Sequence, residues 1–284
     1  MNYQWYPGHM TKARRMMQEN MKLIDLVIEL VDARIPVSSR NPDIDELGQN
    51  KSRIVLLNKS DLADPAYNKQ WIEYFKRQDT HVLEINSKTG AGVKGIQSVV
   101  QAACKDKLER DRKRGIVNRP VRAMVVGIPN VGKSTFINSF AGKACTKTGN
   151  KPGVTKGKQW IRLNKNLELL DTPGILWPKF EDQQVGMHLA FIGSMNDEII
   201  IMEELACDLL DCLGTLYPEA VSERYGIGHR DSSAEMLEEI ARVRGCILKG
   251  ENPDLKKAAS VLLEDFRSGR LGRITIECPV EERG

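Results

Sequence analysis

The segment Gly127–Ser134 has the residue types and spacing needed to hold phosphate groups. It fits the pattern G-x-x-x-x-G-K-[ST], and its two glycines let successive backbone N–H groups turn toward an anion at the start of a helix. We expect Lys133 to reach the β and γ phosphates of a nucleotide, and the Ser134 hydroxyl to take a Mg²⁺ position. A strand pattern before the segment and a helix pattern after it disfavour the alternative, a chance glycine-rich turn.

A second phosphate-reading segment, Asp171–Gly174, follows at the end of a predicted strand. Its pattern, D-x-x-G, is weak alone and becomes specific after a phosphate loop. We expect Asp171 to hold Mg²⁺ through water, and the Gly174 N–H to meet the γ-phosphate. Between the two segments, Pro152–Thr155 resembles the first switch of GTPases, in which Thr155 would complete the Mg²⁺ shell. The run 143–158 around it holds five lysines and no acidic residue, which suits either a solvated loop or one that faces an RNA backbone.

The segment Asn58–Asp61 has the pattern N-K-x-D and directly follows an apolar strand pattern. The Asp61 carboxylate can accept two hydrogen bonds from guanine N1–H and N2–H₂, a donor pair that adenine lacks. Lys59 should lay its stem along the ring. Further along the chain, Asn86–Lys88 resembles the S-A-K element, whose backbone N–H contacts guanine O6. The alternative for 58–61 is a turn with an incidental Asn-Lys pair. The presence of the other nucleotide-binding motifs in the same chain disfavours this alternative.

Together these segments predict one nucleotide pocket, in which the base-reading segment precedes both phosphate-reading segments. An ordinary GTPase has the opposite order, so the chain resembles the circularly permuted GTPases. The predicted metal ligands are Ser134, Thr155 and Asp171 for Mg²⁺, and Asn130 is a candidate for holding K⁺ near the phosphates. The predicted nucleotide-binding residues are Asn58, Lys59, Ser60, Asp61, Asn86, Ser87, Lys88, Asn130, Val131, Gly132, Lys133, Ser134, Thr135 and Gly174.

The glutamine that orients the attacking water in many GTPases is absent after Asp171–Gly174. Ile175 and Leu176 stand there, and an aliphatic side chain cannot align water, so hydrolysis without a partner should be slow. A cation held by Asn130 could stand in for an arginine finger. His9 lies in a turn before a basic helix pattern and could reach the phosphates or lie on RNA. The ordinary alternative is an exposed histidine with no role.

The motifs lie on a chain that alternates strand and helix patterns in residues 1–178. This alternation predicts an α/β fold with a doubly wound, mostly parallel sheet of about six strands. Residues 179–284 show helix patterns and predict a C-terminal all-helical domain. Residues 1–110 form the base-reading half, 121–178 the phosphate-reading half, and the charged stretch at about 105–122 joins them. The strand patterns lie at 26–31, 53–57, 81–85, 121–126, 158–163 and 167–170.

Composition agrees with a cytoplasmic enzyme. At 284 residues the chain can hold one domain of ordinary size and a smaller one. A net charge of +4 is by itself weak evidence for an anionic partner. Six cysteines without a C-x-x-C pair favour free thiols in a reducing compartment. No apolar run approaches about 18 residues and no secretory signal pattern opens the chain, so we expect neither a membrane span nor export.

Three further motifs, together with the permuted order, carry a family resemblance. They are Trp5–Met10, Asp32–Pro36 and Asp265–Gly269, and with them nearly the whole chain resembles the ribosome biogenesis GTPase A family (RbgA, also called YlqF). The resemblance implies a GTPase that uses GTP, GDP and Mg²⁺ and licenses a late step in maturation of the large ribosomal subunit. It implies binding to the subunit precursor, with its rRNA and ribosomal proteins, and we expect a monomer. It also makes His9 the leading candidate for positioning water, and the helical domain an RNA contact.

Two rival functions stay open on the residues alone. One is an RNA-binding module that keeps GTP as a structural ligand with little turnover, which Ile175 permits. The other is an ATP-dependent kinase or ATPase built on the same phosphate loop, which Asn58–Asp61 disfavours. Multiple-turnover assays with and without ribosomal subunits separate the first rival from a hydrolysing assembly factor.

Overall fold

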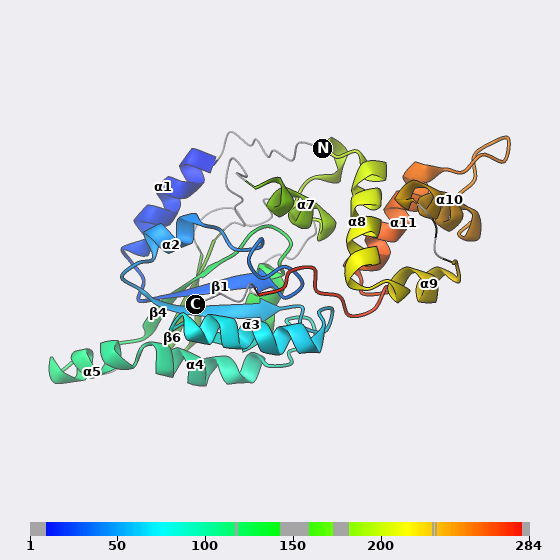
Figure 1. The fold of residues 1–284 in the computed structure, drawn as a ribbon. Helices are drawn as coiled ribbons and strands as arrows, with labels where there is room; N and C mark the ends of the chain where they lie inside the picture. Colours follow the sequence, from blue (N-terminus) through cyan, green and yellow to red (C-terminus); the bar gives the residue numbers. More distant parts are fainter. Residues whose placement is uncertain are drawn as a thin grey trace. The chain divides into compact units, whose positions relative to one another are not determined.

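The computed structural model describes residues 10–116, 119–142, 159–172, 182–228, 230 and 232–279. By their contacts these residues form two compact units (Figure 1). The sheet unit comprises the described residues up to 172 together with Glu277–Pro279, and the helical unit comprises those from 182 to 276. The chain therefore returns to the sheet unit at its last described residues, whereas the sequence assigned everything after 178 to one helical domain. Within the described residues, no helix combines the length and the hydrophobicity that a membrane-spanning segment requires.

Six strands form the sheet, in the order β3-β2-β1-β4-β6-β5. All are parallel except β5, which pairs antiparallel with β6. This arrangement confirms the predicted doubly wound, mostly parallel sheet. The strands are β1 Leu26–Asp32, β2 Ser52–Asn58, β3 His81–Glu84, β4 Val121–Val126, β5 Gln159–Asn164 and β6 Leu167–Asp171.

The topology of the sheet determines where a ligand site can form. From β1 the chain continues outward to β2 and β3 on one side, and β4 is then added on the other side of β1. The strand order therefore reverses between β1 and β4. Ligand sites of open α/β sheets form at such a reversal, beside the carboxyl ends of the strands. Because β1, β2, β3, β4 and β6 are parallel, the segments that follow them all begin at that one edge.

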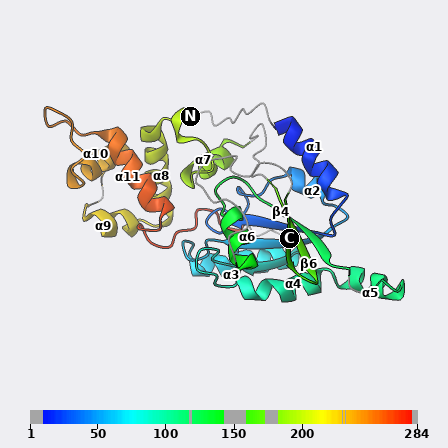
Figure 2. The same ribbon diagram turned by 180° about the vertical axis from the view of Figure 1, so that it is seen from behind.

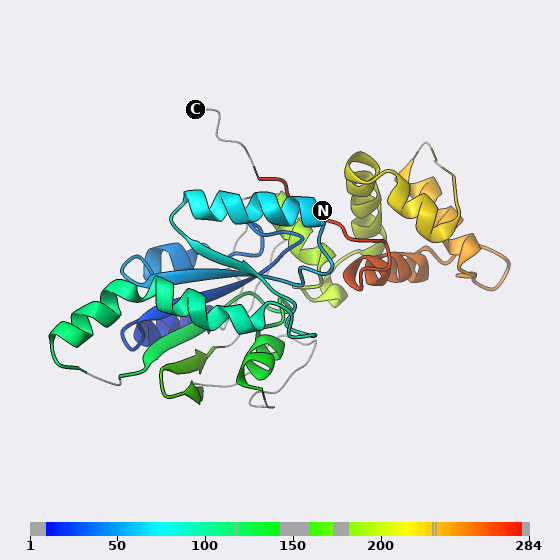
Figure 3. The same ribbon diagram turned by 90° about the horizontal axis from the view of Figure 1, so that it is seen from below.

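Helices cover both faces of the sheet. β1 is buried along its whole length, as a strand between two helical layers must be. On one face, Met17 of α1 and Ile44 of α2 pack over β1, β4 and β6, and Trp71 of α3 packs over β1 and β2. α4 and α6 lie on the opposite side from α3 (Figure 3), and α6 is seen best from behind (Figure 2). The helices are α1 Met10–Met21, α2 Asp43–Leu47, α3 Pro65–Arg77, η1 Val93–Gly95, α4 Ile96–Ala103, α5 Lys105–Lys113 and α6 Lys133–Ala141.

The helical unit packs α8, α10 and α11 against one another, with α7 beside α8 and α11. Apolar side chains at helical spacing form its core, among them the buried Leu209, Ile240 and Leu262. The Ser232 hydroxyl caps α10 by accepting a hydrogen bond of 3.2 Å from the Glu235 N–H. The elements are α7 Gln183–Phe191, η2 Asp197–Ile199, α8 Met202–Leu216, α9 Glu219–Tyr225, α10 Ser233–Val243 and α11 Leu255–Arg267.

Candidate nucleotide-binding site

The predicted phosphate loop, Gly127–Ser134, connects β4 to α6, which begins at Lys133. Two of its residues, Asn130 and Gly132, have positive φ angles of 62° and 94°. Only glycine fits at position 132, because a Cβ added there would lie 2.6 Å from Asn58 Nδ2. The loop thus delivers Lys133 to the first turn of α6, where backbone N–H groups and the helix dipole favour phosphate.

Asn58 ties the base-reading half of the chain to the phosphate loop. Its side chain is buried, and its Nδ2 donates to the Val131 carbonyl oxygen at 2.6 Å. Its Oδ1 accepts from both the N–H and the hydroxyl of Ser87, at 3.0 and 2.7 Å. One side chain therefore joins three segments that the sequence assigned to a single pocket.

Asn86 and Ser87, which replace the first two residues of the S-A-K pattern, have separate tasks in the turn after β3. The Asn86 Oδ1 accepts from the N–H of Lys88 at 2.9 Å and from the N–H of Thr89 at 3.1 Å. The N–H and the hydroxyl of Ser87 both donate to the Asn58 Oδ1. The two polar side chains therefore close the turn and hold it against the base-reading segment.

Asp61, the predicted base reader, is exposed at the end of the segment that follows β2. The backbone beside it is fixed at Ser60. The Ser60 N–H donates to the Ile85 carbonyl, and the Ser60 carbonyl accepts from Asn68 Nδ2, both at 3.2 Å. A fixed backbone with an exposed carboxylate suits recognition of a base edge.

Lys59 is anchored by Asp32, which the sequence analysis named only as part of a family motif. The Lys59 Nζ donates to Asp32 Oδ2 at 2.9 Å. Arg34 donates to both oxygens of the same carboxylate, from Nε at 2.9 Å and from Nη2 at 2.8 Å. Burial works to raise the pKa of the Asp32 carboxyl, but Arg34 and then Lys59 outweigh burial and hold that pKa well below its usual range. Asp32 is the last residue of β1, and its position at the edge of the sheet is the signal that could have revealed it.

Two of the predicted Mg²⁺ ligands lie at the same edge of the sheet. Asp171 is the last residue of β6 and is in register with Val125 of β4, the strand that leads into the phosphate loop. The next residue, Thr172, is buried and its hydroxyl donates to the Val125 carbonyl at 2.7 Å. Ser134 lies in the first turn of α6. A hydroxyl and a carboxylate suit Mg²⁺, which prefers hard oxygen ligands.

Four predicted positions lie outside the described residues: His9, Thr155, Gly174 and Ile175. Their roles remain predictions, as do the nucleotide contacts of the residues that the structure brings together. Thr135 is half-buried on α6, and Asn130 is half-buried in the phosphate loop.

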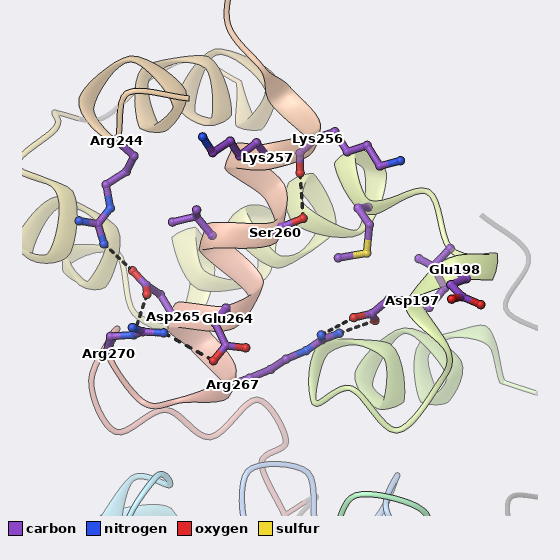
Figure 4. Close-up of a pocket in the computed structure, with 13 residues that line it drawn as sticks. Asp197, Glu198, Arg244, Lys256, Lys257, Ser260, Glu264, Asp265, Arg267 and Arg270 are labelled. Atoms are coloured by element: carbon purple, nitrogen blue, oxygen red, sulfur yellow. Dashed lines mark hydrogen bonds and ion pairs between the residues drawn. The ribbon is translucent and has the colours of Figure 1, made fainter. Parts of the chain in front are cut away.

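A groove of about 920 Å³ runs along α11 in the helical unit (Figure 4). Ion pairs cross it. Arg267 binds Asp197 at 2.7 Å, and Asp265 binds Arg244 at 3.1 Å and Arg270 at 2.8 Å. Asp265 and Arg267 belong to the third family motif, so this motif contributes to the groove.

Comparison with known proteins identifies relatives along nearly the whole chain. A family model described as "50S ribosome-binding GTPase" matches residues 122–208. Ribosome biogenesis GTPase A of Bacillus cereus is 48% identical, with 98% of this chain and 94% of that protein covered. The protein of the same name from Thermotoga maritima is 34% identical, with 97% and 94% covered. The crystal structure of GNP-bound YlqF from T. maritima matches with a TM-score of 0.68 and 29% identity, over 94% of this chain and 98% of that one. The chain is therefore a GTP hydrolase that belongs to the ribosome biogenesis GTPase A family.

Proposed function

We propose that this GTPase acts in late assembly of the large ribosomal subunit, where GTP hydrolysis times its release from the precursor particle. The observation that carries the proposal is the match, over nearly the whole chain, to relatives named for ribosome biogenesis. The description of the matching family model names the 50S ribosome, and this favours the large subunit as the partner. We place the protein in the cytoplasm as a monomer, with the rRNA and ribosomal proteins of the precursor as its partners.

In this proposal, each task of hydrolysis falls to a different part of the nucleotide site. Asp61 and Lys59 select guanine, and the phosphate loop with Lys133 orients the phosphates. Mg²⁺, held by the predicted ligands, would offset phosphate charge. Ile175 leaves the attacking water unaligned, so turnover is slow until a ribosomal particle completes the site. His9 is our candidate for the group that then orients the water.

Co-sedimentation with large-subunit precursors tests this function. We expect binding with a non-hydrolysable GTP analogue, release with GDP, and turnover that rises when particles are added. Equal binding in every nucleotide state, together with turnover that particles do not stimulate, would favour the alternative. The alternative is an RNA-binding module in which GTP is a structural ligand.

Lys256 and Lys257 make the groove of the helical unit the candidate rRNA contact. Both are exposed near the start of α11 and line the groove. Within the described residues neither ammonium group has an ion-pair partner, whereas Arg244 and Arg267 nearby are paired with carboxylates. The groove also carries four carboxylates, those of Asp197, Glu198, Glu264 and Asp265, so Lys256 and Lys257 are the cations available there for a phosphate backbone.

Replacing Lys256 and Lys257 with alanine should weaken binding to precursor particles and leave GTP affinity unchanged. Each lysine that contacts a phosphate contributes about 0.7–0.9 to the slope of log affinity against log salt, so the slope should become shallower. Sedimentation over a salt series measures this. The control is Lys69→Ala with Lys94→Ala, which removes the same charge from exposed positions of the sheet unit. An equal loss in the control would mean that only net charge matters.

A K⁺ ion at Asn130 predicts a salt-specific rate. Replacing K⁺ with Na⁺ should lower turnover, and removal of the Asn130 amide should abolish the difference between the salts. The positive φ of Asn130 makes alanine strained there, so Asn130→Gly is the cleaner variant, with Asn130→Ala beside it. Equal wild-type rates in the two salts would exclude the K⁺ role.

A further inference from the structure

We propose that Asp32 is a positioning residue for guanine recognition, which fixes Lys59, and that Glu277 holds the loop that carries Asp32. The proposal deepens the proposed nucleotide site and rests on the base-reading role of Asn58–Asp61. It gives a role to the motif Asp32–Pro36 and to Glu277, neither of which is predicted to contact the nucleotide.

Asp32 and Lys59 are joined through backbone as well as side chain. Asp32 ends β1 in register with Asn58, the last residue of β2, and the N–H of Ala33 donates to the Asn58 carbonyl at 2.9 Å. Lys59 then has a φ of 58°, in the left-handed region that a lysine seldom adopts. The 2.9 Å bond from its Nζ to Asp32 directs the side chain toward β1. The position of Lys59 thus depends on a carboxylate outside the base-reading segment.

The Asp32 carboxylate is itself rigid. It is fully buried, and Arg34, which is 1% exposed, donates to it from Nε, Nη2 and the backbone N–H. The N–H of Asp32 donates to the Ser39 hydroxyl at 2.9 Å, and that hydroxyl donates to the Ile35 carbonyl at 2.7 Å. The loop 33–39 therefore folds around Asp32, and its shape fixes where the carboxylate can hold Lys59.

Glu277 closes the outer side of this loop. Its carboxylate accepts from the N–H of Val37 at 2.7 Å and from the N–H of Ser38 at 3.0 Å. The carbonyl of Glu277 accepts from Nε1 of the buried Trp71 at 3.0 Å, and its own N–H donates to the Arg34 carbonyl at 3.4 Å. A residue 240 positions from Val37 thus stabilises the loop that supports base reading.

A double-mutant cycle on nucleotide affinity tests the proposal. Asp32→Asn should weaken the affinity for GTP, GDP and inosine diphosphate by the same factor, about tenfold. The reason is that Lys59, which lies along the face of the base in the proposed site, loses its ionised partner, whereas the contacts to the N2 group are unchanged. The loss should appear in KM more than in kcat. In a Lys59→Met background, Asp32→Asn should add little, since its effect passes through the lysine. Fluorescent-nucleotide titration measures all four proteins.

Glu277→Ala keeps the test decisive if Asp32→Asn fails to fold. It should give a smaller loss of the same kind, which also disappears in the Lys59→Met background, while the exposed control Glu73→Ala leaves affinity unchanged. If the affinity losses of Asp32→Asn and Glu277→Ala add to the loss of Lys59→Met, these residues have a merely structural role and the proposal is overturned. Unchanged affinity in both variants would overturn it as well. Asp61→Asn is measured alongside. If Asp61→Asn also leaves GTP affinity unchanged, the base-reading assignment itself fails, which separates the two failures.

Discussion

Asp61→Asn should convert a guanine-nucleotide site into one that favours xanthine nucleotides. The substitution exchanges one carboxylate oxygen for an amide donor, which would face the N1–H and N2–H₂ donors of guanine. Xanthine carries a carbonyl at C2 and matches the new amide. Loss of charge-assisted bonds worth about 1.5–3 kcal/mol corresponds to a roughly ten- to hundredfold weaker affinity for GTP. Competition titration with GDP and xanthosine diphosphate measures the exchange.

The structure favours a clean result for Asp61→Asn. The side chain is exposed, and the backbone beside it is held through Ser60 and Asn68, so the fold does not depend on the carboxylate. The control is Asp79→Asn, which makes the same charge change at an exposed position whose φ of 53° asparagine tolerates. Wild-type GTP affinity in Asp61→Asn would refute the base-reading assignment.

His9→Ala should reduce particle-stimulated turnover by about a hundredfold or more, the usual contribution of a group that orients water or transfers a proton. GTP affinity and particle binding should stay near wild type, because the predicted base and phosphate contacts lie elsewhere in the chain. Single-turnover hydrolysis on saturating precursor particles measures the effect. His81→Ala is the control, since His81 is exposed and begins β3, at the opposite end of that strand from the site.

Two other outcomes for His9→Ala have separate meanings. Lost particle binding with unchanged turnover per bound molecule would make His9 an RNA contact. Unaltered stimulated turnover would remove His9 from the mechanism.

Local sequence patterns predicted the strands of the sheet and the pocket segments that follow them, because neighbouring residues determine these parts of the fold. The strands are apolar runs because helices cover both faces of the sheet, and the pocket segments follow those strands directly, so their shared edge could be inferred. The bonds from Asn58 to Val131 and Ser87 then join segments that patterns had already named.

The support behind the site could not be inferred in the same way. The bonds from Glu277 to Val37 and Ser38 connect residues about 240 positions apart, and a glutamate near a chain end carries no local signal. The family motifs at Asp32 and Asp265 could be recognised in the sequence, but the sequence did not show what these side chains contact. The structure shows these contacts, since each motif places a buried aspartate among cations. Short helices such as α2 and α9 have too few residues to show a clear helical period in the sequence.

The return of the chain to the sheet unit makes the helical unit an insertion and not an appendage. The chain leaves between the described residues 172 and 182 and comes back at Glu277, so the unit is tethered at both ends. Glu277 is thereby kept near Val37 and Ser38 at an effective concentration on the order of millimolar, whatever the protein concentration in the cell. A soluble competitor for that loop would have to act against this local concentration. A single cleavage between Ile276 and Glu277 would instead make the contact bimolecular, and dilution would then dissociate it.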